Sequence, residues 1–440
     1  MKTLEKNEVL EKRKEFLMPS VSHYYENPPV ITKGSMQYVW DADGKKYLDL
    51  FAGIVTVNAG HCHPEVAQKI KEQIDTLQHT TTMYVTEPIV RLAMKLAEIT
   101  PGDLKQSFIT NSGTEANEGA ALLSKMATGS QDFIALRHSF HGRSMMSMSL
   151  TGQYNWRIGG PYVAGVQFVS SAYCYRCPFG KTYPSCNLEC AKDIENVIRT
   201  STPGKIAAFI AEPIQGNGGV ITPPPEYFKE AHAIVKKYGG LFISDEVQTG
   251  FGRTGNKWFG IEQWGIVPDI MTMAKGMGNG LPIGGFITKP EIAGKLGPGQ
   301  HFNTFGGNPI SSTGALASIE VIEKEGLKEN AAKIGSYFKE KLMELKDRFQ
   351  IIGDVRGIGL MLGMEFVKDR KTKAPAVSET KQFMEMCKDK GLLVGKGGLD
   401  GNVIRITPPL RITKENVDQA IQVFEEVLKQ LQIQVFEEVL

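Results

Sequence analysis

Short apolar runs alternate with amphipathic segments along the first three quarters of the chain. Residues 226–238 place their apolar side chains on one helical face, and Gly239 and Gly240 end the predicted helix. Strands that alternate with helices in this way predict an α/β fold with a mostly parallel sheet. The apolar runs that predict strands are residues 107–110, 133–136, 207–211, 241–244, 270–274 and 285–288.

The pattern changes beyond about residue 325, where long charged helices flank short strands. Helices are predicted over residues 330–349 and 379–390, and strands over 360–366 and 403–407. We interpret this part as a smaller α+β domain that the N-terminal segment completes. The predicted boundaries are residues 1–55 for the N-terminal segment, 56–325 for the large domain and 326–440 for the rest of the small domain.

The C-terminal end contains one octet twice, IQVFEEVL, at residues 421–428 and 433–440. The first copy continues a helix that Thr413 should cap. A repeat this short has no partner unit on which to stack, so it predicts no solenoid. We interpret residues 431–440 as a duplicated tail and assign it no function.

The composition fits a cytoplasmic globular protein. The chain has 440 residues, of which 41% are hydrophobic, enough for a large core and at least two domains. Its 50 basic and 48 acidic side chains leave a formal charge of +2, which provides no basic surface for nucleic acid. No apolar stretch is long enough to span a membrane, and the charged N-terminus lacks the apolar centre of a secretory signal.

Four of the six cysteines crowd into an inserted loop at residues 172–190. Their CxxC and CxxxC spacing is compatible with a structural zinc or iron–sulfur site, whereas a cytosolic enzyme more often has ordinary reduced thiols. We predict no catalytic metal. The four residues are Cys174, Cys177, Cys186 and Cys190.

An acid and an amine follow two of the predicted strands. Asp245 comes directly after residues 241–244, and Lys275 directly after residues 270–274. Open α/β sheets bind ligands outside the carboxyl ends of their strands, so both side chains should face one crevice. A lysine that can form a Schiff base and an acid that can pair with a pyridinium nitrogen are what pyridoxal phosphate (PLP) requires. The alternative is a structural salt bridge between them.

The segment NSGTEAN follows the strand at residues 107–110 and opens a helix. Gly113 lets the backbone approach an anion, Thr114 offers a hydroxyl, and the free N–H groups of the helix start can hold a phosphate together with Ser112. A simple helix cap is the alternative, because serine and threonine are favoured there. The presence of Lys275 in the same chain favours the phosphate site.

Eight motifs in order make the chain resemble the class III (ω-amino acid) PLP-dependent aminotransferases. The resemblance implies a fold type I enzyme with a large cofactor domain, a seven-stranded sheet and a split small domain. It is fullest for the alanine–glyoxylate and β-alanine–pyruvate branch. The motifs are GHCHP, NSGTEAN, FHGR, AEPIQG, DEVQTGFGR, AKGMGNG, HFNTFGGNP and VIRITPPL.

The resemblance implies a role for each residue around the cofactor ring. Lys275 would form the Schiff base and then act as the general base, while Asp245 would hold the ring nitrogen protonated. Phe140 would stack on the ring, and its neighbour His141 is assigned to the same site. Two further ring contacts are implied, from Val247 on the opposite face and from Gln248 to the 3-oxygen.

The resemblance also implies how the substrate is held. Arg405 matches the arginine that takes the α-carboxylate, a task for which its planar fork is suited. Glu212 matches a glutamate that pairs with this arginine when no α-carboxylate is present. Arg143 corresponds to an arginine that can hold the distal carboxylate of 4-aminobutyrate, or else forms an ion pair outside the site. Ile54 matches a pocket-wall position.

The loop at residues 301–309 is rich in small residues. In the family this loop crosses a dimer interface, so Thr304 would donate to the phosphate bound by the partner subunit. The resemblance therefore implies a homodimer, or a tetramer built from dimers, with shared active sites. The alternative is a loop internal to one subunit.

The reaction expected from the resemblance is transfer of an amino group from a small amino donor to a 2-oxo acid. Alanine, β-alanine, ω-amino acids or amines are the expected donors, and pyruvate or glyoxylate the expected acceptors. Transamination between 4-aminobutyrate and 2-oxoglutarate is the alternative within the family. A PLP lyase, an isomerase and a non-catalytic relative are the alternatives on the same fold.

Overall fold

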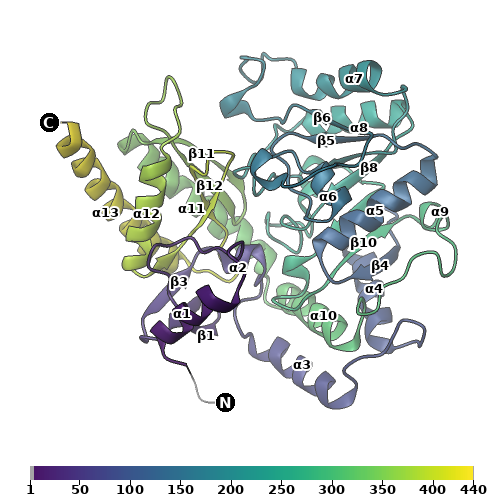
Figure 1. Ribbon diagram of the computed structural model, residues 1–440, viewed down its shortest axis with the longest axis horizontal. Helices are drawn as coiled ribbons and strands as arrows, with labels where there is room; N and C mark the ends of the chain where they lie inside the picture. The colour runs from purple at the N-terminus through teal and green to yellow at the C-terminus, as the bar shows by residue number, and fades with distance from the viewer. Residues whose placement is uncertain (1–3, 440) are drawn as a thin grey trace.

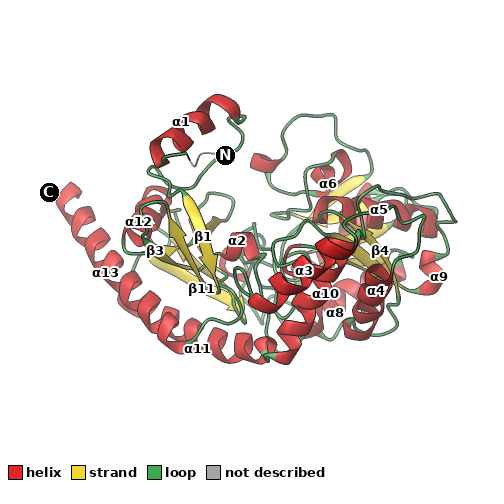
Figure 2. Cartoon of the chain, turned by 90° about the horizontal axis from the view of Figure 1, so that it is seen from below, coloured by secondary structure: helices red, strands yellow, loops and turns green. Residues whose placement is uncertain are grey.

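The computed structural model describes residues 4–439 as two unequal lobes (Figure 1). Both ends of the chain belong to the smaller lobe, which holds helices α1 (Lys6–Phe16), α12 (Val377–Asp389) and α13 (Lys414–Val439) (Figures 1 and 2). Helix α13 is continuous through residue 439, so both copies of the octet belong to one helix as far as that residue. Residues 1–3 of the predicted N-terminal segment and Leu440 of the predicted tail lie outside the described residues.

The larger lobe is built on a seven-stranded sheet with the order β4-β10-β9-β8-β7-β5-β6. Neighbouring strands are parallel except around β10, which is antiparallel to both β4 and β9. The predicted α/β fold with a mostly parallel sheet is confirmed. Strand β10 reverses because only residues 274–283 separate it from β9, fewer than a helical crossover of about a dozen residues needs. The strands are β4 (Gln106–Thr110), β5 (Phe133–Leu136), β6 (Val166–Val169), β7 (Ala208–Ala211), β8 (Leu241–Asp245), β9 (Ile270–Met273) and β10 (Gly284–Thr288).

Helices cover both faces of this sheet, which explains why its strands are continuous apolar runs rather than alternating ones. Phe209 and Phe242 pack into the main core with helices α7 and α8. Their neighbours Ile210 and Ile243 point to the opposite face and pack into a second core with helix α5. The larger lobe contains α2 (Ala52–Val55), α3 (Pro64–Thr76), α4 (Glu87–Ile99), α5 (Gly113–Thr128), α6 (Met145–Leu150), α7 (Glu189–Ser201), α8 (Tyr227–Lys237), α9 (Pro290–Ala293), α10 (Pro309–Lys324) and the 3-10 turns η1 (Tyr154–Trp156), η2 (Cys174–Arg176), η3 (Gly260–Trp264) and η4 (Lys275–Met277).

The smaller lobe contains two four-stranded sheets, with the orders β1-β2-β3-β13 and β11-β12-β15-β14. Strand β13 pairs in parallel with β3, so the two ends of the chain share one sheet. This pairing supports a small domain split between the two ends, whereas its boundaries at residues 55 and 325 stay a prediction. Its elements are β1 (Ile31–Ser35), β2 (Tyr38–Asp41), β3 (Lys46–Asp49), α11 (Leu327–Arg348), β11 (Ile352–Ile358), β12 (Met361–Phe366), β13 (Leu392–Leu393), β14 (Gly395–Gly397) and β15 (Val403–Ile406).

Several strands of the structure carry no clear strand pattern in the sequence. In β11 the charged residues Asp354 and Arg356 interrupt the apolar run. Arg356 forms 2.8 Å ion pairs with Asp354 and with Glu365 of β12, so tertiary contacts compensate the buried charges. The N-terminal strands and β6 are short and half-exposed. Across residues 4–439, no helix has both the length and the hydropathy needed to cross a membrane.

Candidate active site

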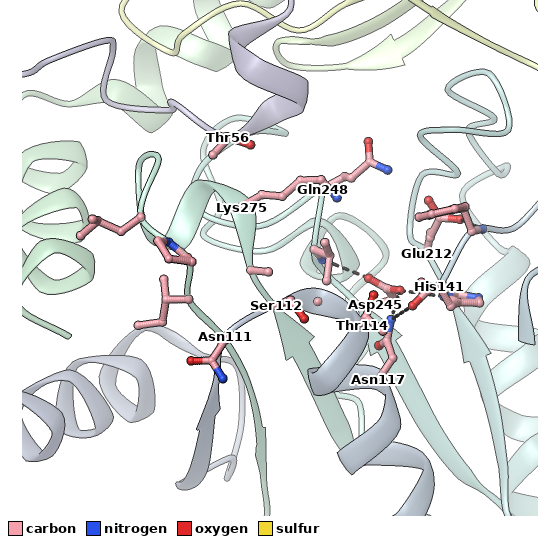
Figure 3. Close-up of a pocket in the computed structure, with 18 residues that line it drawn as sticks. Thr56, Asn111, Ser112, Thr114, Asn117, His141, Glu212, Asp245, Gln248 and Lys275 are labelled. Atoms are coloured by element: carbon pink, nitrogen blue, oxygen red, sulfur yellow. Dashed lines mark hydrogen bonds and ion pairs between the residues drawn. The ribbon is translucent and has the colours of Figure 1, made fainter. Parts of the chain in front are cut away.

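A cavity of about 280 Å³ opens where strands β8 and β9 end and helix α5 begins (Figure 3). This is the carboxyl-end edge of the parallel strands, where open α/β sheets bind ligands. The structure therefore brings together most of the site residues that the sequence predicts. Those lining the cavity are Ser112, Gly113, Thr114, Phe140, His141, Glu212, Asp245, Val247, Gln248 and Lys275.

Lys275 lies two positions after the end of strand β9 and borders the cavity. Its backbone is left-handed, with φ at +46°, and a Cβ at the next residue, Gly276, would lie 2.4 Å from the side-chain nitrogen of Asn58. Burial lowers the pKa of Lys275 to about 8, although the charge of Asp245 opposes this shift. More of the amine is then neutral near pH 7, as a nucleophile requires.

The alternative of a structural salt bridge between Lys275 and Asp245 is not supported. The described ion pairs include none between these two side chains. Asp245 instead accepts a 2.7 Å hydrogen bond from Nδ1 of His141 and a 2.8 Å bond from Nδ2 of Asn117, both at Oδ2 (Figure 3). Its other oxygen accepts from the main-chain N–H of Val247 at 3.1 Å. These contacts hold a buried carboxylate, 3% exposed, in one orientation at the cavity wall.

Glu246, the next residue, points away from the cavity. Its carboxylate accepts hydrogen bonds from the main-chain N–H groups of Gly260 and Ile261, at 2.8 and 2.7 Å, and from the hydroxyls of Ser244 and Thr249. Glu246 therefore organises the loop after β8, and Asp245 is the acid that faces the site.

Helix α5 begins beside the cavity and caps itself. The hydroxyl of Ser112 accepts a 3.2 Å hydrogen bond from the N–H of Glu115, so the simple capping role is present. The first N–H groups of a helix have no acceptor within the helix, and here they lie at a cavity. A Cβ at Gly113 would come within 2.9 Å of Val247, and one at Gly142 within 2.6 Å of Thr114 Oγ1. The absence of a side chain at these two glycines keeps the backbone close to the site. The capping role of Ser112 is compatible with anion binding at the start of α5.

Arg405 lies in strand β15, is 2% exposed and donates from Nη2 to the side-chain oxygen of Gln248 at 2.5 Å. Burial lowers the pKa of Arg405. The expected ion pair between Arg405 and Glu212 does not occur among the described residues. Glu212 accepts instead from the N–H groups of Phe140 and Gly216, at 2.9 and 3.0 Å. These two N–H groups occupy both oxygens of Glu212. The sequence pattern does not predict these two bonds.

Four predicted residues do not line the cavity within one chain. Arg405 is connected to it through its hydrogen bond to Gln248, and the other three lie outside it. Ile54 is 47% exposed and lies in α2, a turn with left-handed backbone angles. Arg143 and Thr304 are exposed, and Thr304 belongs to the loop between α9 and α10. Their proposed contacts with substrate or with a partner subunit stay predictions.

Some residues of the cavity were not expected from the sequence. Asn117 could have been predicted, because it lies three residues after Thr114 and therefore on the same face of α5. Asn111, Gly142 and Ala274 belong to the motifs NSGTEAN, FHGR and AKGMGNG, although the sequence assigned them no role. The others are supplied by loops whose sequence gives no hint of the site, and they are Thr56, Leu281, Pro282 and Ile283.

The cysteine-rich loop lies away from this cavity and is anchored to the smaller lobe. Tyr173 donates to Glu365 of β12, and Arg176 pairs with the same carboxylate at 2.6 Å. Its four cysteines are free. Within the described part of the chain, no group of three or more His, Cys, Asp or Glu side chains is arranged to hold a metal ion.

Residues 21–428 match the family model described as aminotransferase class-III. The chain is a class III aminotransferase. This aminotransferase is 51% identical over 414 residues to alanine–glyoxylate aminotransferase 2 homolog 2, mitochondrial, of Arabidopsis thaliana, with 94% of this chain and 86% of that protein covered. It is 39% identical over 429 residues to the leucine/methionine racemase of Thermococcus litoralis, covering 97% and 96% of the two chains.

Solved structures agree with this assignment. The crystal structure of an amine transaminase from an uncultivated Pseudomonas species, in its PLP-bound form, superposes with a TM-score of 0.88 and 30% identity. The match covers 94% of this class III aminotransferase and 98% of that chain. The fold is therefore fold type I, as the resemblance implied.

The cofactor of the class III aminotransferase is PLP, and the cavity fits it. A buried lysine with a lowered pKa, an oriented carboxylate and a helix start meet at one cavity. These are the groups that a Schiff base, a pyridinium nitrogen and a phosphate need. The protein is a PLP-dependent transaminase that moves an amino group from an amino donor to a 2-oxo acid acceptor.

Proposed function

We propose that this aminotransferase uses alanine, β-alanine or a related ω-amino acid or amine as donor, and pyruvate or glyoxylate as acceptor. The observation that carries the proposal is Arg405, a buried guanidinium whose hydrogen-bond partner, Gln248, lines the cavity. A guanidinium in this place suits a small substrate with one carboxylate beside the reacting carbon. The name of the Arabidopsis relative, an alanine–glyoxylate aminotransferase, supports the same substrates.

In the proposed mechanism, Lys275 binds the cofactor and then moves the proton at the substrate Cα. When bound, PLP supplies an electron sink for the negative charge that develops at that carbon. Asp245, held by His141 and Asn117, keeps the ring nitrogen protonated. The lowered pKa of Lys275 matches it to proton transfer near neutral pH.

The remaining predicted residues position the cofactor and the substrate. The start of α5, with Ser112, Gly113 and Thr114, holds the phosphate. Phe140 and Val247 enclose the ring, because both line the cavity. Arg405, which donates to the side-chain oxygen of Gln248 at rest, would take the substrate carboxylate, and the side-chain nitrogen of Gln248 would donate to the ring 3-oxygen.

We propose that Glu212 responds to the charge of the substrate without forming an ion pair at rest. Burial and the negative charge of Asp245 raise the pKa of Glu212 to about 7, although its hydrogen bonds oppose the shift. Near neutral pH this group can therefore be neutral or charged, which suits a pocket that accepts donors with and without an α-carboxylate.

A specific observation favours one alternative, isomerisation. The racemase of Thermococcus litoralis is 39% identical over nearly the whole chain, so this family includes isomerases with closely related sequences. Transamination of 4-aminobutyrate has less support, because Arg143 is exposed and outside the cavity within one chain.

We propose a homodimer, or a tetramer of dimers, with shared active sites. Large apolar side chains are exposed on two neighbouring segments, which the ring contact of 5.3 Å between His79 and Phe305 brings together. Burying such a surface against a second copy would stabilise the assembly. Thr304 lies in one of these segments. The exposed side chains are Met83, Tyr84 and Val85, at 75, 70 and 91%, and Phe302 and Phe305, at 49 and 61%.

We also propose that the protein acts in the cytoplasm, although the name of the Arabidopsis relative includes the word mitochondrial. Fractionation of cells that express the tagged full-length chain tests this proposal.

A panel of donors assayed against pyruvate, glyoxylate and 2-oxoglutarate tests the substrate assignment. We expect turnover with alanine or β-alanine and one of the first two acceptors. Loss of optical activity from a single enantiomer of leucine or alanine, with no acceptor consumed, would instead support the isomerase.

A further inference from the structure

Arg253 is a fully buried arginine that forms no ion pair with a described carboxylate. Its guanidinium donates to three neutral oxygens instead. Nη1 bonds the main-chain oxygens of Leu360 and Pro408 at 3.0 and 2.5 Å, and Nη2 bonds the side-chain oxygen of Asn58 at 2.6 Å. A buried charge without a counter-ion is costly, so its presence calls for an explanation beyond stability.

The two main-chain acceptors lie next to the strands that support Arg405. Leu360 lies in the turn between β11 and β12, and β12 pairs with β15, the strand that carries Arg405. Pro408 follows the end of β15 by two residues. The guanidinium thus holds both strands from the side of the larger lobe, because Arg253 itself lies in the loop after β8.

The third acceptor leads to Lys275. Asn58 donates from Nδ2 to the main-chain oxygen of Phe251 at 3.1 Å. The same nitrogen lies so close to Gly276 that a Cβ there would be 2.4 Å away. The main-chain oxygen of Asn58 accepts from the N–H of Leu410 at 2.9 Å. Asn58 is therefore packed between Arg253 and the backbone that follows Lys275.

We propose that Arg253 is a positioning residue, which fixes the strand that carries Arg405 relative to the loop that carries Lys275. The proposal rests on the roles proposed for these two residues. Arginine suits the task because one planar group can donate to three oxygens in fixed directions. A lysine at the same place would keep the positive charge but would lack the planar guanidinium that fixes the directions of the hydrogen bonds.

Arg370 provides a matched control. Its guanidinium also donates to main-chain oxygens, those of Gln350, Ile352 and Phe349, at 3.2, 3.1 and 3.0 Å, and that of Lys346. All four acceptors lie in the smaller lobe, so Arg370 stabilises that lobe without connecting it to Lys275. Both Arg370→Lys and Arg253→Lys should lower the thermal stability, but only Arg253→Lys should affect the active site.

The test compares Arg253→Lys and Arg370→Lys in two backgrounds, with Arg405 intact and with Arg405→Lys. With Arg405 intact, Arg253→Lys should lower kcat/KM for alanine by about 10- to 100-fold, the loss expected from misplacing a binding group by about 1 Å. In the Arg405→Lys background the further loss should be less than about threefold, because the two residues act on the same contact. Arg370→Lys should leave kcat/KM unchanged in both backgrounds.

Hydrogen exchange of the cofactor-free protein gives a readout that does not depend on activity. Arg253→Lys should speed exchange in residues 274–280 and 403–410, and Arg370→Lys should not. If Arg253→Lys fails to fold, Asn58→Ala, which removes one of the three bonds, should show the same pattern with a smaller loss.

Equal losses from Arg253→Lys in both backgrounds, or unchanged exchange in both segments, would overturn the proposal. If Arg405→Lys itself leaves kcat/KM for alanine unchanged, the function proposed for Arg405 fails. The exchange experiment alone then decides whether Arg253 couples the two segments.

Discussion

Replacing Arg405 with alanine should cripple the reaction with alanine and spare the reaction with a primary amine that has no carboxylate. Arg405 is 2% exposed, so a substrate carboxylate bound to it is removed from water. Removing one partner of such a buried pair costs about 2–5 kcal/mol. Because about 1.4 kcal/mol corresponds to a factor of ten, kcat/KM for alanine should fall by about 30-fold to a few thousandfold.

The structure also predicts what the mutation does to the free enzyme. The side-chain oxygen of Gln248 loses its donor, which should reduce the free energy of unfolding by about 1–3 kcal/mol. Glu212 should be little affected, since its oxygens accept from the N–H groups of Phe140 and Gly216. The amine reaction should therefore survive in the single mutant without a second change at Glu212.

The assay is the half-reaction of each donor with the cofactor-loaded enzyme, followed by stopped-flow absorbance. Arg411→Ala is the control, because Arg411 lies six residues further on, is partly buried and forms a 3.2 Å ion pair with Glu325. Equal losses with both donors, or a loss in Arg411→Ala as large as in Arg405→Ala, would refute the reasoning. Arg143 would then be the next candidate for the carboxylate.

Three further predictions follow from the same site. Asp245→Asn should retain the cofactor yet slow proton transfer at Cα by about 10²–10³-fold, measured by stopped flow, because a neutral side chain no longer stabilises the ring nitrogen; a near-normal rate would show that Asp245 is not the ring partner. Thr304→Ala should weaken cofactor binding by about 1–3 kcal/mol in equilibrium titration, and an unchanged affinity or a fully active monomer in sedimentation would contradict the shared site. In the cofactor-free protein burial lowers the pKa of Lys275 to about 8, against 10.5 for an ordinary lysine. Between these two pH values Lys275 is protonated in the unfolded chain and neutral in the native state, so the Tm of the wild type should rise with pH relative to that of Lys275→Met. A difference in Tm that stays constant with pH would show that Lys275 is not buried.

The parts of the site that the sequence predicts lie at the ends of strands. Asp245 and Lys275 follow buried apolar runs, and the geometry of parallel strands brings their ends to one edge of the sheet. Six of the seven strands of the large sheet are predicted from similar apolar runs, whereas β6 is half-exposed and is not. The reversal of β10 depends on the length of a connection. Thr114 and Asn117 share a helix face, which local spacing also predicts.

The rest depends on contacts between distant segments. The partners of Glu212 are main-chain N–H groups of residues 140 and 216, and the ion pair with Arg405 that the resemblance implied does not occur among the described residues. Arg253 ends the DEVQTGFGR motif, but the motif does not show what the residue does, because its acceptors lie at residues 58, 360 and 408. Every residue has a main-chain oxygen, so the sequence does not show which of these oxygens accept from a given side chain. Only the fold shows this.

The central claim, that Lys275 carries the cofactor, is tested most directly by reducing the PLP-loaded enzyme with borohydride and mapping its peptides by mass spectrometry. The account predicts that the pyridoxyl group remains attached to the peptide that contains Lys275, and that Lys275→Ala retains no attached group. Attachment to another lysine, or a Lys275→Ala variant with wild-type turnover, would contradict it.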